Sequence, residues 1–433
     1  VECVFPYADV LTPNKYEAEA LLHRKLTCPE DVEQGARDLL AMGVQSVLIK
    51  GGHTLVETND GTDGSAIAPD VNATLGYAQD YFLSRGSDTD RMCDGPRGVW
   101  IRNKRYDSPH THGTGCTLSS AIASALALGH LSRETGHGTG AMRAIQAMDA
   151  CCLAKAYVTA GIGQGVQLGK GSGPVAHTKF PSTHEHYPTI AFNPTHANPP
   201  AFLPMISSQA ASVSSSSTKK IILGKILPIV STTEWITKLC ETKGITDVQL
   251  RIKDPQITSN TTAVTQLIAE SSTICSRNNV RLWINDYWKE ALSLPVNNKP
   301  FGIHLGQEDL TKCIDCGGIA KLREAQLALG ISTHSFGELS VASALRPSYI
   351  SLGPIYDTTS KDVNFEAQTV DTVRKWRELV GDDVPLVGIG GINDAERVKE
   401  VRNAGVDCVA VIGAVTKVED LDTAVDCLIK AMN

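Results

Sequence analysis

The chain has 433 residues, which is too long for one ordinary domain and predicts about two or three. Its net charge of −7 at pH 7 argues against nucleic acid or an anionic membrane as the main partner, while small anionic ligands stay possible. The 12 scattered cysteines do not form the framework of a small disulfide-stapled secreted module, so we expect a reducing intracellular compartment.

The first 175 residues alternate between helix-like and strand-like segments. The expected helices are 16–22, 31–43, 117–129 and 140–158, and the expected strand is the apolar run 45–52, which ends in glycines. This alternation predicts an α/β domain with a parallel sheet. The polar, Gly- and Asp-rich stretch 59–105 has few periodic features, so we expect an insertion or a lid there.

The stretch THGTGCTLSS puts Gly113, Gly115 and Cys116 directly before the helix expected at 117–129. Small residues let an anion approach the free N–H groups and the positive end of a helix. The sequence therefore predicts a phosphate-binding helix start. The alternative is that a helix packed closely on a strand selects the same glycines for steric reasons alone.

The composition changes between residues 176 and 219, where prolines recur and a serine run follows. Such a segment buries too little apolar surface to offset its ordering entropy, so we interpret it as a linker. The irregular spacing of its four histidines favours solvated linker residues over a metal site. We therefore expect domains at 1–175 and 220–433.

Eight short apolar runs recur after residue 220, most of them separated by helix-length stretches. They span 228–232, 247–252, 281–286, 301–306, 329–333, 349–353, 385–390 and 408–413. Eight β/α units in about 210 residues predict a (β/α)₈ TIM barrel, with a doubly wound sheet as the second choice. The pair Cys313 and Cys316 has metal-like spacing but lacks a second pair, so we expect a turn beside a helix rather than a zinc site.

Unusual polar residues recur where the expected barrel strands end, at Gln249, Arg251, Lys253, Asn285, Asp286, Asp309, Ser332 and Lys361, and glycines recur at Gly391 and Gly413. Polar side chains at the C-terminal ends of barrel strands face one shared mouth. Carboxylates suit Mg²⁺, which is often shared with substrate phosphates, and Lys and Arg neutralise the remaining phosphate charge. Together these residues predict a site for a polyphosphate, a metal and a second phosphate. Singly, each also fits a surface charge, a helix cap or a tight turn.

Residues 220–433 resemble thiamine phosphate synthase along their whole length, because VQLRIKD, INDYW, HLGQEDL, GISTH, GPIYDTTSKD and GIGGI occur in the family's order. The resemblance implies condensation of hydroxymethylpyrimidine diphosphate with hydroxyethylthiazole phosphate, with release of pyrophosphate. It implies a pyrimidine-diphosphate site at Gln249, Arg251, Lys253, Asn285, Ser332 and Lys361. It also implies Mg²⁺ ligands at Asp286 and Asp309, and a thiazole phosphate site at Thr358, Thr359, Ser360, Gly391, Ile412 and Gly413.

The implied mechanism is departure of pyrophosphate from the pyrimidine methyl carbon, followed by attack of the thiazole nitrogen on the carbocation. Arg251, Lys253 and Lys361 would be the catalytic residues that stabilise charge on the leaving group. Two positions depart from the family. Gly413 stands where a serine is usual, and the first strand, in PIVSTTEW, lacks the usual Tyr and Asp.

Residues 4–175 resemble the C-terminal half of hydroxymethylpyrimidine phosphate kinase, a ribokinase-like enzyme. The resemblance lies in LTPNKYEAEALL with Asn14 and Glu17, in VLIKGG with Lys50, and in HTHGTGCT with Gly113, Gly115 and Cys116. It implies that the carboxylate organises Mg²⁺, that the lysine neutralises the transferred phosphate and that Cys116 takes the place of a catalytic base. A complete module would use ATP–Mg, and its product would be the substrate of the synthase.

The sequence begins after the first half of that kinase, at a valine. We therefore expect either a fragment of a longer bifunctional protein or a vestigial kinase module, without kinase activity as it stands. The expected partners are small phosphorylated pyrimidines and thiazoles, and no nucleic acid. We expect no membrane partner, because no apolar run approaches the roughly 18 residues of a span. A homo-oligomer stays open, and cytoplasm or plastid is the expected location. The alternatives are a thiazole tautomerase-like barrel and a non-catalytic thiamine-phosphate binding protein.

Overall fold

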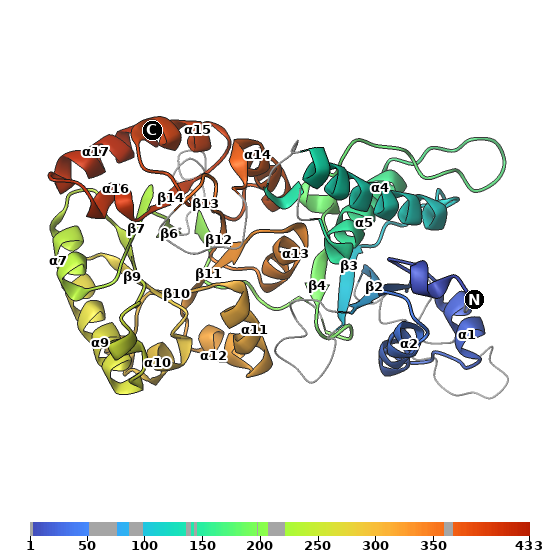
Figure 1. Cartoon of the computed structure of the whole chain (residues 1–433), viewed down its shortest axis with the longest axis horizontal. Helices are drawn as coiled ribbons and strands as arrows, with labels where there is room; N and C mark the ends of the chain where they lie inside the picture. Colours follow the sequence, from blue (N-terminus) through green and yellow to red (C-terminus); the bar gives the residue numbers. More distant parts are fainter. Residues whose placement is uncertain are drawn as a thin grey trace. The chain divides into compact units, whose positions relative to one another are not determined.

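The computed structural model describes residues 3–51, 76–85, 98–135, 140–142, 145–196, 198–206, 221–358 and 367–433. They form two compact units, one built mainly from residues 1–199 and one built mainly from residues 200–433. In Figure 1 the first unit runs from blue to green and the second from yellow-green to red. The domain limits expected at 175 and 220 stay predictions.

The first unit contains a four-stranded sheet in the order β1 (Ser46–Lys50), β2 (Tyr77–Ser84), β3 (Val99–Lys104) and β4 (Thr189–Ala191). All three strand pairs are antiparallel, so the prediction of a parallel sheet is wrong for these strands. Parallel pairing at this sheet, within the described residues, is limited to the isolated bridges of Leu11 to Val47 and of Asn14 to Lys50 in β1. Short apolar runs look alike in both kinds of sheet, and β2, β3 and β4 were not among the expected strands.

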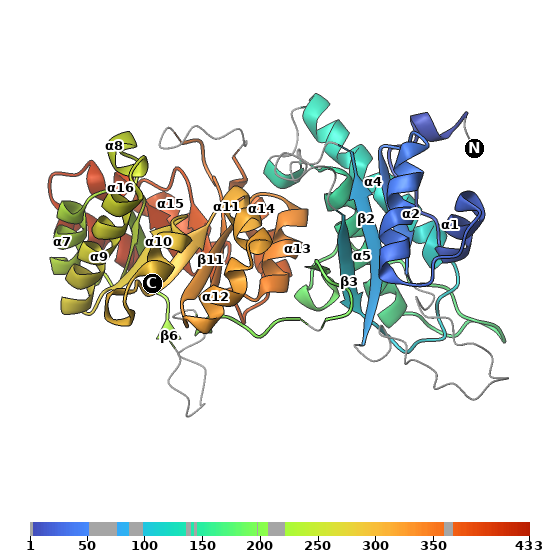
Figure 2. The ribbon, with the colours of Figure 1, turned by 90° about the horizontal axis from the view of Figure 1, so that it is seen from below.

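Helices cover both faces of this sheet (Figure 2). On one face, α1 (Lys15–Leu22) and α2 (Pro29–Ala41) share a core with Val47 and Ile49 of β1. On the other face, α5 (Ala147–Gly163) contacts β2 and β3, and α4 (Thr114–Thr135) packs along α5. The sheet therefore lies between two layers of helices, and successive side chains of each strand point alternately to one layer and to the other.

The stretch 59–105, expected to be an insertion or a lid, contributes two strands of the sheet instead. Trp100 and Ile101 of β3 are buried in the domain core, which is incompatible with a lid over the described part of the stretch. Its polar side chains partly explain the error, because Arg102 is buried and donates to Gln79 Oε1 at 2.9 Å. Residues 59–75 and 86–97 lie outside the described residues.

The expected linker carries short strands where the structure describes it. Besides β4, residues Met205–Ile206 (β5) pair in parallel with Ile221–Ile222 (β6). Residues 207–220, with the serine run, lie outside the described part of the chain.

Helix α4 contradicts the expectation that no run approaches the length of a membrane span. It has 22 residues and a mean hydropathy of 1.2, which is long and apolar enough by length and composition. Leu118 and Ile122 are buried, but only 22% of the apolar stretch of α4 is buried inside the described structure. A single helix of this kind is weak ground for a membrane span, because core helices meet the same two criteria.

The second unit is a closed barrel of eight parallel strands, as predicted (Figure 1). The strands are β7 (Ile226–Val230), β8 (Asp247–Leu250), β9 (Arg281–Asn285), β10 (Gly302–Leu305), β11 (Ala328–Thr333), β12 (Tyr349–Leu352), β13 (Leu386–Ile389) and β14 (Cys408–Val411). The ring closes where β14 pairs with β7. The prediction of a TIM barrel is confirmed and the doubly wound sheet is excluded.

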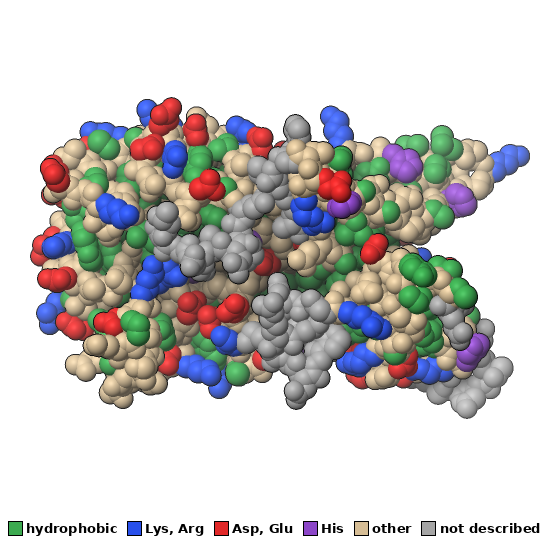
Figure 3. All heavy atoms as spheres, in the orientation of Figure 1, with side chains coloured by type: hydrophobic (Ala, Val, Ile, Leu, Met, Phe, Trp, Pro, Cys, Tyr) green, Lys and Arg blue, Asp and Glu red, His purple; other side chains and the backbone are tan. Residues whose placement is uncertain are grey.

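The helices that follow these strands are α7 (Thr233–Glu241), α8 (Pro255–Thr258), α9 (Thr261–Arg277), α10 (Trp288–Ser293), α11 (Gln307–Asp315), α12 (Gly318–Glu324), α13 (Phe336–Leu345), α14 (Thr369–Val380), α15 (Ala395–Asn403), α16 (Gly413–Thr416) and α17 (Leu421–Ala431). Several begin at side-chain caps, such as Asp394 before α15 and Asp420 before α17. On the face drawn in Figure 3, the described acidic and basic side chains of the barrel are interspersed rather than gathered in a stripe of one sign. A one-sign stripe is the pattern typical of nucleic-acid binding.

A buried ionic network closes the N-terminal end of the barrel. Asp247, the first residue of β8, has no exposed surface and accepts hydrogen bonds from Arg281 Nε at 2.8 Å and from Trp283 Nε1 at 3.0 Å. The backbone N–H of Gly224 donates to the same carboxylate at 2.9 Å. Both carboxylate oxygens of Asp247 accept hydrogen bonds, so the buried charge is satisfied. The donors come from β9 and from the chain that enters β7, so the network joins these segments to β8.

Candidate functional site

The C-terminal ends of β8 and β9 carry the residues expected to bind the diphosphate. Gln249 lies inside β8 and is 2% exposed, whereas Arg251 is half-buried and Lys253 is exposed just beyond the strand end. Asn285 is the last residue of β9. The strand register aligns Gln249 with Trp283, so the two strand ends lie at the same level of the barrel.

Asp286 follows β9 in a left-handed backbone conformation, with φ of 72°. Aspartate and asparagine tolerate this region better than most residues, although it is still a strained position for a side chain. The Asn285 amide donates to the Asp286 carboxylate, and the Asp286 backbone N–H donates to the His304 carbonyl oxygen at 2.9 Å. Asp286 is therefore held at the end of β9 by its own strand and by β10, and the Gly306 N–H after β10 donates to its carboxylate at 3.5 Å.

Asp309 lies in the first turn of α11 and forms an ion pair with Lys312 at 3.3 Å. The Tyr287 phenol senses the charges of both aspartates. Burial raises its pKa, and the negative charges of Asp286, Glu290 and Asp309 raise it further. Within the described ranges no cluster has three or more His, Cys, Asp or Glu side chains that hold a metal. The oxygen donors of Asp286 and Asp309 suit Mg²⁺ that completes its coordination with substrate oxygens and water.

Ser332 of β11 lies half-buried at the mouth and is held from below. Its Oγ is 2.8 Å from His304 Nε2 and 3.3 Å from Ser351 Oγ. His304 Nδ1 is in turn 2.8 Å from the Tyr349 hydroxyl. Sequence reasoning noticed His304 in the fourth barrel strand but assigned it no role, and it missed Tyr349. A histidine inside an apolar strand is an unusual choice that signals a specific partner.

The residues expected at the thiazole phosphate lie on the loops after β12, β13 and β14. Gly390 and Gly391 have φ of 95° and 68°, and a Cβ on Gly391 would meet the Asp357 carbonyl oxygen at 2.7 Å. The glycine therefore lets this loop approach the one that ends at Thr358. Ile412 is the N-cap of α16, and Gly413 begins that helix. Thr359, Ser360 and Lys361 lie outside the described residues, so their roles stay predictions.

In the first unit, the expected kinase residues gather around Lys50. Asn14 and Glu17 form a capping box at the start of α1, with Glu17 N–H donating to Asn14 Oδ1 at 2.9 Å and Asn14 N–H donating to Glu17 Oε2 at 2.7 Å. Lys50 Nζ lies 3.9 Å from Glu17 Oε2 and 3.4 Å from the position of a Cβ on Gly115. The capping role of Glu17 leaves its carboxylate facing the lysine and the start of α4.

A buried ion pair supports the loop after Lys50. Lys155 Nζ of α5 lies 2.6 Å from Asp80 Oδ2, and the Gly51 N–H donates to Asp80 Oδ1 at 2.9 Å. Both side chains are more than nine-tenths buried. Sequence reasoning missed this pair, which fixes the backbone next to the candidate phosphate site.

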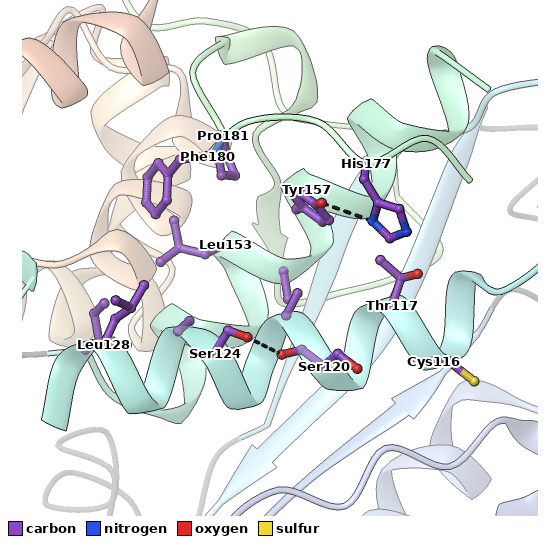
Figure 4. A pocket seen from close by; sticks show the side chains of 14 residues that line it. Cys116, Thr117, Ser120, Ser124, Leu128, Leu153, Tyr157, His177, Phe180 and Pro181 are labelled. Atoms are coloured by element: carbon purple, nitrogen blue, oxygen red, sulfur yellow. Dashed lines mark hydrogen bonds between the residues drawn. The ribbon is translucent and has the colours of Figure 1, made fainter. Parts of the chain in front are cut away.

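A cavity of about 490 Å³ extends along α4 from Cys116 (Figure 4). Its walls are mostly apolar, with Leu128 of α4 and Leu153 of α5 among them. The Tyr157 hydroxyl and His177 Nδ1, 3.2 Å apart, form a polar edge. Gly113, with φ of 82°, precedes α4, so the helix start and the cavity lie next to each other. This arrangement suits a ligand with a phosphate at one end and an apolar or aromatic part at the other.

Comparisons with known proteins find a match for each of the two units. A family model described as phosphomethylpyrimidine kinase matches residues 1–176, and one described as thiamine monophosphate synthase matches residues 222–415. The thiamine-phosphate synthase of Proteus mirabilis is 40% identical over 195 residues, which cover 45% of this chain and 84% of that protein. The one from Pectobacterium atrosepticum is 40% identical over 206 residues, which cover 47% of this chain and 90% of the relative.

Among solved structures, a thiamine phosphate pyrophosphorylase from Pyrococcus furiosus is 24% identical with a TM-score of 0.38, covering 48% of this chain and 95% of that one. A pyridoxal kinase from Staphylococcus aureus with ADP is 23% identical with a TM-score of 0.29, and the match covers 40% of this chain and 48% of the kinase. The family matches confirm the expected combination of a kinase-like α/β unit with a synthase barrel. The chain belongs to the thiamine-phosphate synthase family, and the part ahead of its synthase barrel matches the phosphomethylpyrimidine kinase model.

Proposed function

We propose that the barrel joins hydroxymethylpyrimidine diphosphate to hydroxyethylthiazole phosphate and releases pyrophosphate. The main support is that Arg251, Asp286 and Asp309 follow β8, β9 and β10, three neighbouring strands whose C-terminal ends meet at the mouth of the barrel. A diphosphate with Mg²⁺ needs this mixture of hard oxygen donors and fixed cations. The family match over residues 222–415 supports the same reaction.

The residues of this chain would act by orientation and charge. Asp286 and Asp309 would hold Mg²⁺, which would neutralise the charge that develops on the departing pyrophosphate. Arg251 and Lys253 would hold the same leaving group, and Lys361 would add a third cation. Gln249 and Ser332 would orient the pyrimidine by hydrogen bonds, and the glycine loop at Gly391 would let the thiazole phosphate approach the backbone.

The test is to mix the full chain with both substrates and Mg²⁺ and to measure pyrophosphate and thiamine phosphate. The proposal expects the two products in equal amounts, dependent on Mg²⁺. Folded protein that binds the substrates without releasing pyrophosphate would instead be a binding or regulatory protein. Conversion of the thiazole alone would indicate a tautomerase.

Gly413 provides a prediction for the thiazole phosphate. Among the described residues, a Cβ at this position would meet Asn393 Oδ1 at 3.7 Å and Lys417 Cδ at 3.8 Å and nothing nearer, so a larger side chain fits there. The hydroxyl of Gly413→Ser would add a hydrogen bond to a charged phosphate, and such bonds are worth about 1.5 kcal/mol or more. We expect a KM for the thiazole phosphate about tenfold lower, measured by steady-state kinetics. Gly413→Ala, which adds the Cβ without the hydroxyl, should leave that KM unchanged, and an equal gain with alanine would contradict the assignment.

We further propose that the start of α4 in the first unit is an ATP–Mg binding site, which would serve phosphorylation of the hydroxymethylpyrimidine in a complete kinase module. Support comes from the gathering of Glu17, Lys50 and Gly115, and from the adjoining cavity that begins at Cys116. Phosphoryl transfer depends mainly on such positioning and charge. Calorimetric titration with ATP–Mg should show binding that Lys50→Ala weakens, and Lys170→Ala serves as a control on an exposed lysine. Equal affinities of both variants would overturn this site.

We also propose small phosphorylated pyrimidines and thiazoles as the partners of this chain, without nucleic acid or membrane, and a reducing compartment, cytoplasm or plastid, as its location. The described cysteines, which are all free thiols, are compatible with that location. A homo-oligomer stays open to measurement by light scattering.

A further inference from the structure

A chain of hydrogen bonds runs beneath the mouth of the barrel, from β12 through β10 to β11. It links the Tyr349 hydroxyl to His304 Nδ1 at 2.8 Å and His304 Nε2 to Ser332 Oγ at 2.8 Å. Tyr349 has no exposed surface and His304 is 6% exposed, so water does not compete for these bonds. Ser332, at the top of the chain, is the only one of the three that borders the mouth.

A glycine makes this linkage possible. In the strand register His304 lies opposite Gly330, and Gly330 lies opposite Tyr349. A Cβ on Gly330 would lie 2.2 Å from the Tyr349 ring, so only glycine lets the ring cross β11. The tyrosine ring then stacks on the imidazole, with centroids 5.6 Å apart and an interplanar angle of 17°. The tyrosine therefore reaches a residue two strands away, an arrangement that strand packing alone does not require.

The direction of these bonds follows from the tyrosine. Burial raises the pKa of Tyr349 well above its usual value, so the phenol keeps its proton. The Gln249 side chain also hydrogen-bonds the phenol and stabilises its charged form, which makes Gln249 a donor and the phenol oxygen an acceptor. The phenol proton then has His304 Nδ1 as its acceptor. A neutral imidazole with an accepting Nδ1 carries its proton on Nε2, and that proton points at Ser332.

We propose that His304, as the neutral Nε2–H tautomer, is a positioning residue that donates to Ser332 Oγ and so turns the serine proton toward the pyrimidine substrate. Ser332 Oγ also receives the Ser351 hydroxyl at 3.3 Å, so both bonds from the barrel interior are made to the serine oxygen. The hydroxyl proton of Ser332 is then directed to the mouth, where it meets an acceptor atom such as a ring nitrogen or a phosphate oxygen. This inference rests on the proposed function, because it makes the pyrimidine diphosphate the ligand of Ser332.

Two substitutions at His304 separate the two ring nitrogens. Gln places its amide near the position of Nε2 and keeps a donor for Ser332, whereas Asn places its amide near Nδ1 and leaves Ser332 without one. We expect His304→Asn to lower kcat/KM for the pyrimidine diphosphate about tenfold or more, with the KM for the thiazole phosphate unchanged. His304→Gln should retain most of the wild-type value. If His304 had a purely structural role, both variants would impair the kinetics with both substrates, and the Asn and Gln variants would behave alike.

A double-mutant cycle tests whether His304 acts through Ser332. In a Ser332→Ala background, His304→Asn should have little further effect on kcat/KM, because the serine it orients is gone. Urea midpoints of all variants show whether folding has changed. Effects that multiply in the double variant, in folded protein, would overturn the proposal.

The tautomer itself is measurable without activity. Long-range ¹⁵N–¹H spectra of ¹⁵N-histidine-labelled full chain, assigned by the signal missing from His304→Gln, should show a protonated Nε2 and an unprotonated Nδ1. Tyr349→Phe should perturb the Nδ1 signal specifically. A proton on Nδ1 would overturn the inference even if the synthase reaction is found, and the expected tautomer in a protein without synthase activity would contradict only the proposed function.

Discussion

Asp286→Asn is expected to lower the turnover of the synthase reaction by about a hundredfold or more, the usual cost of removing a group that stabilises developing charge. Asparagine tolerates the left-handed backbone of this position and keeps the shape of the side chain. The variant therefore loses the negative charge that would hold Mg²⁺ while the strand end stays in place. Pyrophosphate release measured at rising Mg²⁺ concentrations checks this result.

The control for this variant is a carboxylate on the same end of the barrel. Glu308→Gln removes an exposed charge next to Asp309 in α11 and should leave turnover near the wild-type value. Near-normal turnover of Asp286→Asn at saturating Mg²⁺ would rule out Asp286 as an essential metal ligand. A loss of the same size in both variants would point to a general charge effect at the mouth.

Asp247→Asn is expected to destabilise the barrel by about 3 to 5 kcal/mol, because it leaves Arg281 partly buried without its counter-charge. The arginine Nη2 lies 2.5 Å from Asp247 Oδ2, and the carboxylate is fully buried. Unfolding in urea, followed by the hydrogen exchange of peptides from β8 and β9, reports on the barrel rather than on the first unit.

The matched variant is Asp371→Asn, which breaks an ion pair with Arg374 on the surface of α14. Asp371 is 83% exposed, and such pairs contribute at most about 1 kcal/mol. If the two variants shift the unfolding midpoint equally, the Asp247 network has no special part in the stability of the barrel. Asp247→Asn should also keep its synthase activity below the unfolding midpoint, because Asp247 lies at the end of the barrel opposite the site.

The barrel was predictable from sequence because each strand is a short apolar run followed by a helix-length segment, a local pattern that fixes strand type and parallel pairing together. The sheet of the first unit was not, since β2 carries Gln79 and Asp80, and β3 carries Arg102, as buried polar residues. These side chains find partners within the fold, such as Lys155 for Asp80, and that pairing is invisible in a single sequence. A polar stretch therefore resembled a surface insertion.

The candidate site shows the same division. Residues such as Arg251 and Asp286 follow strands directly, so their position at the mouth could be inferred from strand order alone. The support for Ser332 could not, because it depends on Gly330 admitting the ring of Tyr349 from the next strand. Tyr349 reaches His304 because Gly330 lacks a Cβ atom, and the hydrophobic periodicity of the sequence does not reveal this contact. Glu17 was a candidate from the sequence, but its contact with Lys50 and its second role in capping α1 were visible only in the structure.

The Asp247 network at the lower end of the barrel has a consequence for how this enzyme can change. The buried network lies where the strands begin and the substrate-binding residues lie where they end, for example Asp247 at the start of β8 and Arg251 beyond its last residue. Substitutions that improve packing at the lower end need not disturb the ligands at the mouth. Because of that separation, the mouth loops can accept destabilising substitutions, such as those that change substrate specificity, before the barrel unfolds.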